Sequence, residues 1–231
     1  NSSYYLFSFF ITCYCLIGCN QVDSEQNITI ENSTISLSFD KNTGALVSLK
    51  NTDNPYNFLS PNSAQESLWE VDLLRDSVVT TIDMSMASGF HFTKKDPHTL
   101  LLTWENFSGI KNKNFKINAT ITLEENKSLS AWKIAVEETK GESISKVVFP
   151  KISGIKDLGD EYLAVPKWMG EKMKNPRTYL SKMESEEKKY EWPYPGRLSL
   201  QCIALYNDSK KFGLYTACND ALAYRKDFSY T

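Results

Sequence analysis

The chain has 231 residues, with 26 Lys and Arg against 28 Asp and Glu, and a formal net charge of -2. This balance excludes a typical nucleic-acid-binding protein, because affinity for phosphates requires clustered positive charge. Hydrophobic residues make up 41% of the chain and aromatic residues 13%. Such a composition is enough for a folded core and argues against a disordered chain.

The N-terminal segment differs from the rest of the chain. Residues 4–18 (YYLFSFFITCYCLIG) carry no charge and are too short for an ordinary membrane-spanning helix. They are typical of the apolar part of an export signal whose basic beginning is missing. The segment ends in Leu16-Ile17-Gly18-Cys19, which resembles the lipobox of bacterial lipoproteins, where the Cys is acylated and becomes the new N-terminus. The resemblance implies a lipid anchor at Cys19 and a place in the bacterial cell envelope, periplasmic or at the cell surface.

The remaining chain is expected to be one folded domain on a short tether. The polar residues 20–26 (NQVDSEQ) fit the tether, and residues 27–231 fit the domain. Position 1 is not Met, and the sequence stops just after a strand-like run. We therefore expect it to be part of a longer protein.

Alternation of apolar and polar residues, the pattern of a half-buried β-strand, recurs along the domain. Residues 28–32 and 35–39 show it, and a turn at residues 40–44 joins the second run to residues 45–49 as a hairpin. The other expected strands cover residues 67–74, 99–107, 115–123, 129–137, 144–152, 198–206 and 212–218. Short strands separated by turn residues predict an all-β fold, an antiparallel β-sandwich.

One long stretch lacks this pattern. Residues 160–196 are interrupted by four prolines, so we expect an irregular segment that is functional or covers a sheet edge. Within it, residues 182–189 (KMESEEKK) are expected to form a solvated charged loop rather than a helical turn.

Two segments resemble a known family. Residues 28–51 contain the pattern D-x-x-T-G-x-L-x-x-L, in which Asp40 caps the turn and Gly44 supplies a positive φ. The late segment carries Tyr194-Pro195-Gly196, Gln201, Phe212-Gly213-Leu214-Tyr215 and Asn219-Asp220. Together they resemble the galactose-mutarotase-like β-supersandwich that begins an uncharacterised family of bacterial glycoside-hydrolase-like lipoproteins. The resemblance implies a catalytic (β/α)₈ barrel beyond residue 231, which this chain would brace while shaping part of the glycan cleft.

The chain itself shows no catalytic constellation, and whether it belongs to an enzyme rests on the resemblance alone. The adjacent pairs Glu137-Glu138 and Asp160-Glu161 would point to opposite faces of a strand. The sequence has neither a glycine-rich phosphate loop nor a G-x-S-x-G motif. No cofactor or metal is expected, because only two histidines are present and no CxxC follows the signal. Cys202 and Cys218 flank an expected hairpin, where a disulfide and two reduced thiols fit equally well.

Aromatic and basic residues gather in the irregular segment. Aromatic rings pack against the C–H faces of sugars, while a few polar groups fix the hydroxyls. The candidate carbohydrate-binding residues are Trp168, Trp192, Tyr194, Arg177 and Arg197. If the segment binds glycan, the three rings should be partly exposed and line one concavity, with Arg177 or Arg197 nearby. The alternative is that the rings cover the sandwich edge or dock against a neighbouring domain.

Three functions follow from these observations. The first is the N-terminal accessory domain of a membrane-anchored bacterial glycoside hydrolase, with the catalytic domain of the same polypeptide as its partner. The second is a self-contained carbohydrate-binding envelope lipoprotein. The third is a structural lipoprotein that contacts other proteins.

Overall fold

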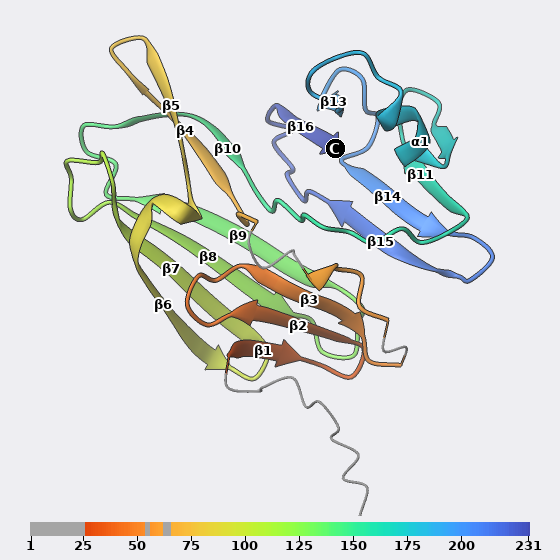
Figure 1. Ribbon diagram of the computed structural model, residues 1–231, viewed down its shortest axis with the longest axis horizontal. Helices are drawn as coiled ribbons and strands as arrows, with labels where there is room; N and C mark the ends of the chain where they lie inside the picture. The colour runs from red at the N-terminus through yellow and green to blue at the C-terminus, as the bar shows by residue number, and fades with distance from the viewer. Residues whose placement is uncertain (1–25, 54–55, 62–65) are drawn as a thin grey trace, which may run out of the picture. The chain divides into compact units, whose positions relative to one another are not determined.

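The computed structural model describes residues 26–53, 56–61 and 66–231, which fold mainly as antiparallel β-strands (Figure 1). The predicted all-β antiparallel sandwich is confirmed. The expected signal, the tether up to residue 25 and Cys19 lie outside the described residues. The chain divides into two compact units, unit 1 (Asn1–Gly154) and unit 2 (Ile155–Thr231), within the span that the sequence suggests is one domain.

Unit 1 contains three sheets. The first has the order β1-β2-β3, the second β6-β7-β8-β9 and the third β10-β4-β5. The strands are β1 (Asn27–Glu31), β2 (Ile35–Asp40), β3 (Leu46–Asn51), β4 (Glu70–Arg75), β5 (Val78–Asp83), β6 (Ala87–Asp96), β7 (Thr99–Phe107), β8 (Lys116–Leu123), β9 (Ser130–Glu137) and β10 (Ser143–Val148). A short 3-10 helix, η2 (Met84–Met86), joins β5 to β6.

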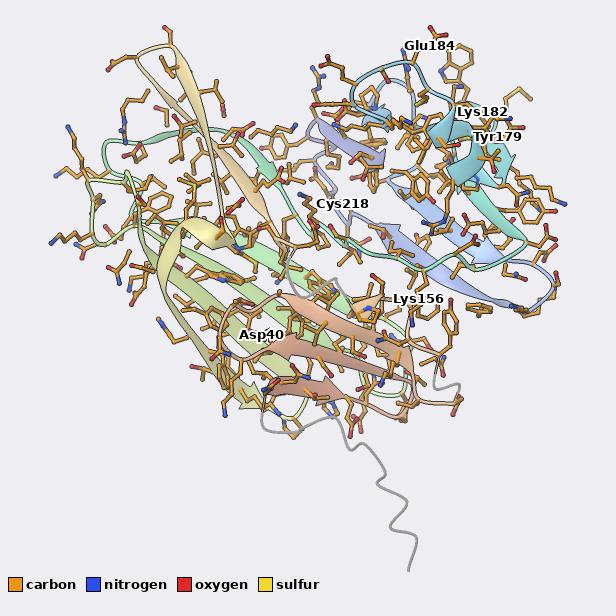
Figure 2. The ribbon with its side chains drawn as sticks, viewed as in Figure 1. Asp40, Lys156, Tyr179, Lys182, Glu184 and Cys218 are labelled. Atoms are coloured by element: carbon orange, nitrogen blue, oxygen red, sulfur yellow. The ribbon has the colours of Figure 1, made fainter. Side chains whose placement is uncertain are left out.

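The first two sheets pack face to face. Burial alternates strictly along β2 and β8, as it must when one face of each strand meets the core. The ring of Phe39 on β2 lies 5.9 Å from that of Trp132 on β9. The indole N–H of Trp104 on β7 donates to the carbonyl oxygen of Thr43 at 2.8 Å. These contacts tie the β2–β3 turn, where Asp40 lies (Figure 2), to the opposite sheet.

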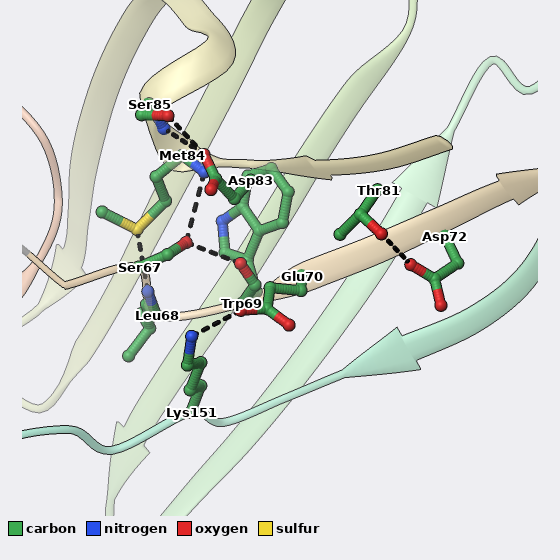
Figure 3. Close-up of polar contacts among 10 residues, drawn as sticks. All are labelled: Ser67, Leu68, Trp69, Glu70, Asp72, Thr81, Asp83, Met84, Ser85 and Lys151. Carbon is green, nitrogen blue, oxygen red and sulfur yellow. Dashed lines mark hydrogen bonds and ion pairs between the residues drawn. The ribbon is translucent and has the colours of Figure 1, made fainter. Parts of the chain in front are cut away.

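The third sheet is attached at the start of β4 (Figure 3). Trp69 is fully buried there, with its ring 5.6 Å from that of Trp104. The Ser67 hydroxyl donates to the carbonyl oxygen of Trp69 at 2.6 Å and accepts from the backbone N–H of Met84 at 3.2 Å. Lys151 forms an ion pair with Glu70. These contacts are structural, because each one joins the strand to a neighbouring segment of unit 1.

Unit 2 contains a four-stranded sheet of order β12-β11-β14-β15 and a two-stranded sheet, β13-β16. The strands are β11 (Glu161–Val165), β12 (Glu171–Lys174), β13 (Tyr190–Tyr194), β14 (Cys202–Asn207), β15 (Phe212–Ala217) and β16 (Lys226–Tyr230). The helix α1 (Pro176–Ser181) follows β12. It begins with Pro at its first position, where the missing N–H is of no consequence.

Two expectations for residues 160–196 have different outcomes. The prediction of an irregular segment is wrong, because β11, β12, α1 and β13 all lie in it. The charged loop at residues 182–189 is confirmed, since no helix or strand forms there. No helix in the described part of the chain has the length and apolarity needed to cross a bilayer.

Candidate functional site

The predicted aromatic cluster does not form one surface. Trp192 is only 4% exposed, so it lacks the exposure that the glycan-binding hypothesis requires of it. It lies on β13 opposite Phe228 of β16, and its ring stacks on Tyr190 at 5.6 Å and 10°. Tyr194 is half-buried, with the ammonium of Lys226 5.1 Å from its ring centre. Both rings therefore belong to the packing of unit 2.

Arg177 has a structural partner. Its Nε donates to Oε1 of Glu161 at 2.7 Å, and its Nη2 donates to the carbonyl oxygen of Lys156 at 3.1 Å. Glu161 is 2% exposed, and its other oxygen accepts from the backbone N–H of Leu158 at 3.2 Å. A buried carboxylate requires a cation and hydrogen bonds to remain charged. Arg177 therefore balances the charge of the buried Glu161 carboxylate rather than facing a ligand.

A buried phenol belongs to the same part of unit 2. Tyr230 is buried, and its hydroxyl has no hydrogen-bond partner among the described residues. Burial raises the pKa of Tyr230 to about 12, with the carboxylates of Glu161 and Asp157 acting in the same direction. This phenol is therefore neutral at physiological pH and takes no part in acid–base exchange there.

Trp168 and Arg197 are the two candidates that remain at the surface. Trp168 is 74% exposed, and Arg197 is exposed as well. The backbone N–H of Trp168 donates to the carbonyl oxygen of Arg197 at 3.1 Å, which fixes the two residues side by side. Of the five predicted residues, the structure thus brings this pair together at the surface and assigns the other three to packing or buried pairing.

The two cysteines of unit 2 are free thiols. Cys202 lies opposite Ala217 on β15, and Cys218, labelled in Figure 2, follows one position later with its N–H bonded to the carbonyl oxygen of Gln201. Adjacent residues of a strand point to opposite faces, so the two thiols lie on different faces of the sheet. Of the two alternatives left open by the sequence, the structure has the thiols and not the disulfide.

A different aromatic surface lies on the outer face of the four-stranded sheet. On β11, Leu163 and Val165 are buried, whereas Tyr162 and Ala164 point to the other face. The register places Tyr162 opposite Tyr206 of β14, and Tyr215 of β15 opposite Ala204. We define the tyrosine face by its three rings, Tyr162, Tyr206 and Tyr215, and the small residues between them, Ala164, Ala204 and Gly213.

The rings of this face are ordered by their neighbours. Tyr162 and Tyr206 stack with centroids 5.9 Å apart and planes 29° apart, and the Lys172 ammonium lies 4.0 Å from the centre of the Tyr162 ring. Tyr215 is the most open of the three, at 60% exposed. Gly213 is required opposite Tyr206, since a Cβ there would lie 2.4 Å from the Cβ of that tyrosine.

Charged side chains border the tyrosine face. Asp208 pairs with Lys211 at 3.0 Å and lies 4.0 Å from Lys172, while Lys174 pairs with Asp160 at 3.1 Å. The hydrogen bond from Lys211 lowers the pKa of Asp208. Bonds with Tyr206 and Asp160 raise the pKa values of Lys172 and Lys174, respectively. These shifts favour the charged forms of Asp208, Lys172 and Lys174.

The face includes an open hollow of about 310 Å³, bordered by Tyr206, Asp208, Lys211, Gly213 and Tyr215. Aromatic rings, small residues and fixed charges around a shallow hollow form a surface that can bind a ligand by stacking and hydrogen bonds. Acid–base catalysis would require a group that exchanges protons near neutral pH. The pKa values of Asp208, Lys172 and Lys174 are instead shifted away from neutral pH.

The adjacent carboxylates do not form a shared site. Glu161 is buried and paired with Arg177, whereas Asp160 is exposed and paired with Lys174. The prediction that this pair points to opposite faces is confirmed. No group of three or more His, Cys, Asp or Glu side chains within residues 26–53, 56–61 and 66–231 could hold a metal ion.

The tyrosine face was missed from the sequence because its rings come from three strands. Tyr162 and Tyr206 are far apart in the chain, and only the register between β11 and β14 brings them together. The alternation of residues 161–165 was the available signal, since it puts Tyr162 on the polar side of a strand. No protein-family model matches this chain, and a search of curated proteins gives no match either.

Proposed function

We propose that this chain is a non-catalytic β-sandwich module that binds carbohydrate through the tyrosine face of unit 2. The observation that carries the proposal is the pair of stacked tyrosines, Tyr162 and Tyr206, beside the more exposed Tyr215 on one sheet face. A sheet holds such rings in fixed positions, so little conformational freedom is lost when a ligand stacks on them.

The chemistry of the border favours a sugar over a purely apolar ligand. Pyranose rings combine apolar C–H faces with hydroxyl groups around the edge. The rings of Tyr206 and Tyr215 fit the former, and the carboxylate of Asp208 and the ammonium of Lys211 can accept from and donate to the latter. An apolar ligand would leave these charges without compensation for the water they lose.

The resemblance described for residues 28–51 and 194–220 supplies a setting for this binding. In that setting the chain is the N-terminal accessory part of a bacterial glycoside hydrolase, anchored in the cell envelope through Cys19. The carbohydrate face would then hold glycan near a catalytic domain of the same polypeptide. Both the setting and the location are part of the proposal.

The first prediction tests the face itself. The protein is applied to a glycan array, and affinity for any positive glycan is measured by calorimetry. Tyr206→Ala and Tyr215→Ala should each weaken binding roughly tenfold or more, because each removes a large apolar contact. Tyr179→Ala is the matched control, since this tyrosine on α1 is 55% exposed and lies outside the face.

The outcome distinguishes binding from docking. Loss of affinity with little change in melting temperature for the two variants supports the carbohydrate face. Equal effects of all three variants would contradict it. So would an absence of glycan binding combined with Tyr206→Ala destabilising only a longer polypeptide, a result that would assign the face to contact with another domain.

A further inference from the structure

A second exposed surface of unit 2 lies at the turn between β11 and β12. Trp168 is 74% exposed, Met169 is fully exposed, and Leu200 on the neighbouring segment is 61% exposed. The two segments run side by side, because Lys167 bridges to Leu198 and the backbone N–H of Ser199 donates to the carbonyl oxygen of Pro166 at 2.8 Å. We call Trp168, Met169 and Leu200 the apolar tip.

The backbone holds the tip outward. Trp168 has φ +53°, a left-handed conformation that is unfavourable for a bulky side chain and persists only where the surrounding structure imposes it. Its N–H bond to Arg197 fixes that conformation. Strain of this kind concentrates at functional sites.

The side chains of the tip are open to solvent among the described residues. Met169 is as exposed as in an extended peptide, and a Cβ added at the next residue, Gly170, would meet no atom within 4 Å. A sugar needs a platform with polar groups around it, whereas the tip offers a projecting cluster of apolar side chains. A projecting apolar cluster can insert into another surface. The interfacial region of a lipid bilayer accepts such a cluster without a matching cleft.

The charges beside the tip are complementary to a lipid headgroup. Arg197 is exposed next to Trp168, and its guanidinium forms no ion pair or hydrogen bond with any part of the chain that the structure describes. Lys167 also flanks the tip, although it pairs with Glu171 at 2.9 Å. A basic residue next to Trp and other apolar side chains is typical of an interfacial contact with anionic lipid.

We propose that the apolar tip inserts into the interface of an anionic lipid bilayer, with Arg197 bound to the headgroups. This contact is separate from the tyrosine face and does not depend on it. Together with an acyl anchor, it would give the protein a second point of attachment, and peripheral attachment becomes durable when two weak signals combine.

The second prediction uses the tryptophans as probes. All five lie in the described residues; Trp69, Trp104 and Trp192 are buried, and Trp132 is half-buried. Trp168 is therefore the indole open to a membrane. Vesicles of phosphatidylglycerol and phosphatidylcholine, prepared with and without brominated acyl chains, should quench its emission on contact. The apolar residues 4–18 contain no Trp. Quenching therefore reports contact of the tip with lipid even if residues 4–18 also bind the vesicle.

Matched variants separate the tip from the rest of the protein. Trp168→Phe should abolish the bromine-dependent quenching and retain most of the affinity. Met169→Ser with Leu200→Ser should raise the lipid concentration needed for half-maximal quenching roughly tenfold, since the variant has lost two apolar side chains that would enter the interface. Arg197→Gln should remove the preference for anionic over zwitterionic vesicles. Tyr224→Ala, which removes a 68% exposed ring elsewhere on unit 2, should behave as the unaltered protein.

Two results would overturn the proposal. In the first, vesicle-bound protein has the same emission with brominated and ordinary lipid. In the second, Trp168 emission responds to soluble glycans or to a protein partner and not to vesicles, which would assign the tip to that partner. Glycan binding by the tyrosine face is measured independently, so either result leaves the proposed function to its own test.

Discussion

At the scale of single residues, the ion pair of Glu161 and Arg177 shows how the interior of unit 2 accommodates charge. The carboxylate is almost completely buried, whereas about a third of the arginine side chain remains exposed. The two partners are therefore not equivalent. Without Glu161 the guanidinium can still reach water, but without Arg177 the carboxylate remains in the interior with a single backbone donor.

The third prediction follows from this asymmetry. Arg177→Met should lower the free energy of unfolding by about 3 kcal/mol, because it leaves an uncompensated buried charge. Adding Glu161→Gln should restore part of the loss, since the charge is then gone. Urea denaturation of the single and double variants measures the coupling.

Arg197→Met provides the control for this cycle, because Arg197 is exposed. Its effect should stay within about 0.5 kcal/mol, as for most surface substitutions. Equal losses for Arg177→Met and Arg197→Met would show that the buried pair contributes nothing specific.

At the scale of elements, the hairpin of β2 and β3 was foreseen most fully. The sequence predicts that Asp40 caps the turn, and its Oδ1 accepts from the N–H groups of Asn42 and Thr43 at 2.9 and 2.8 Å. It predicts a positive φ at Gly44, which is +77°. What it does not predict is the position of this turn against the second sheet, where Gly44 meets Phe90 and Trp104.

The fourth prediction separates two requirements at Gly44, the positive φ and the close contact with Phe90 and Trp104. A Cβ on Gly44 would lie 2.6 Å from a ring carbon of Phe90, whereas one on Gly109, with φ +82°, would meet nothing. Gly109→Ala should therefore cost only the backbone strain of about 1–2 kcal/mol. Gly44→Ala should cost about 1–3 kcal/mol more, because the core must also shift. Similar melting temperatures for the two variants would contradict the tight contact.

Two of the strands that the sequence did not predict, β5 and β13, have an identifiable physical cause. β8 was foreseen because Ile117, Ala119 and Ile121 alternate with polar residues and are buried. By contrast, all residues of β5 up to Thr81 are exposed, so hydrophobic alternation is not needed there. β13 contains Pro193, which argues against a central strand but is tolerated in a two-stranded sheet. Both strands therefore lack the local pattern of alternating residues on which the prediction depends.

The candidate site was predicted less well than the fold. The chemistry expected for residues 165–197, aromatic rings beside cations, is present, but Trp192 packs inward and Arg177 pairs with Glu161. The sequence indicates which residue types lie close along the chain. Whether a ring faces water or the core depends on the strand register, which sequence alone does not supply.

At the scale of the whole molecule, the division at Gly154 assigns the two proposed surfaces to unit 2. Unit 1 contributes a sandwich in which two of its three tryptophans, Trp69 and Trp104, are buried against each other. The proposed anchor lies at the other end of the chain, at Cys19. Membrane attachment is thus expected from two regions of the polypeptide, the acyl anchor at Cys19 and the apolar tip of unit 2, whereas glycan binding is expected from unit 2 alone.

The fifth prediction concerns that anchor. Expressed in a bacterial host, the protein should incorporate labelled fatty acid, and Cys19→Ser should abolish the labelling because the acylated sulfur is removed. Cys202→Ser is the matched control, since Cys202 is a free thiol within the folded unit. Labelling that survives Cys19→Ser would contradict the lipoprotein assignment.

The alternation along β11 also affects how this protein could diverge. Leu163 and Val165 serve the core, while Tyr162 and Ala164, their immediate neighbours, belong to the outer face. If the tyrosine face binds carbohydrate as proposed, substitutions at the outward positions would change ligand preference without altering the packing beneath them. Point mutations could therefore vary the outer face at little cost in folding, because the inward side chains preserve a common architecture.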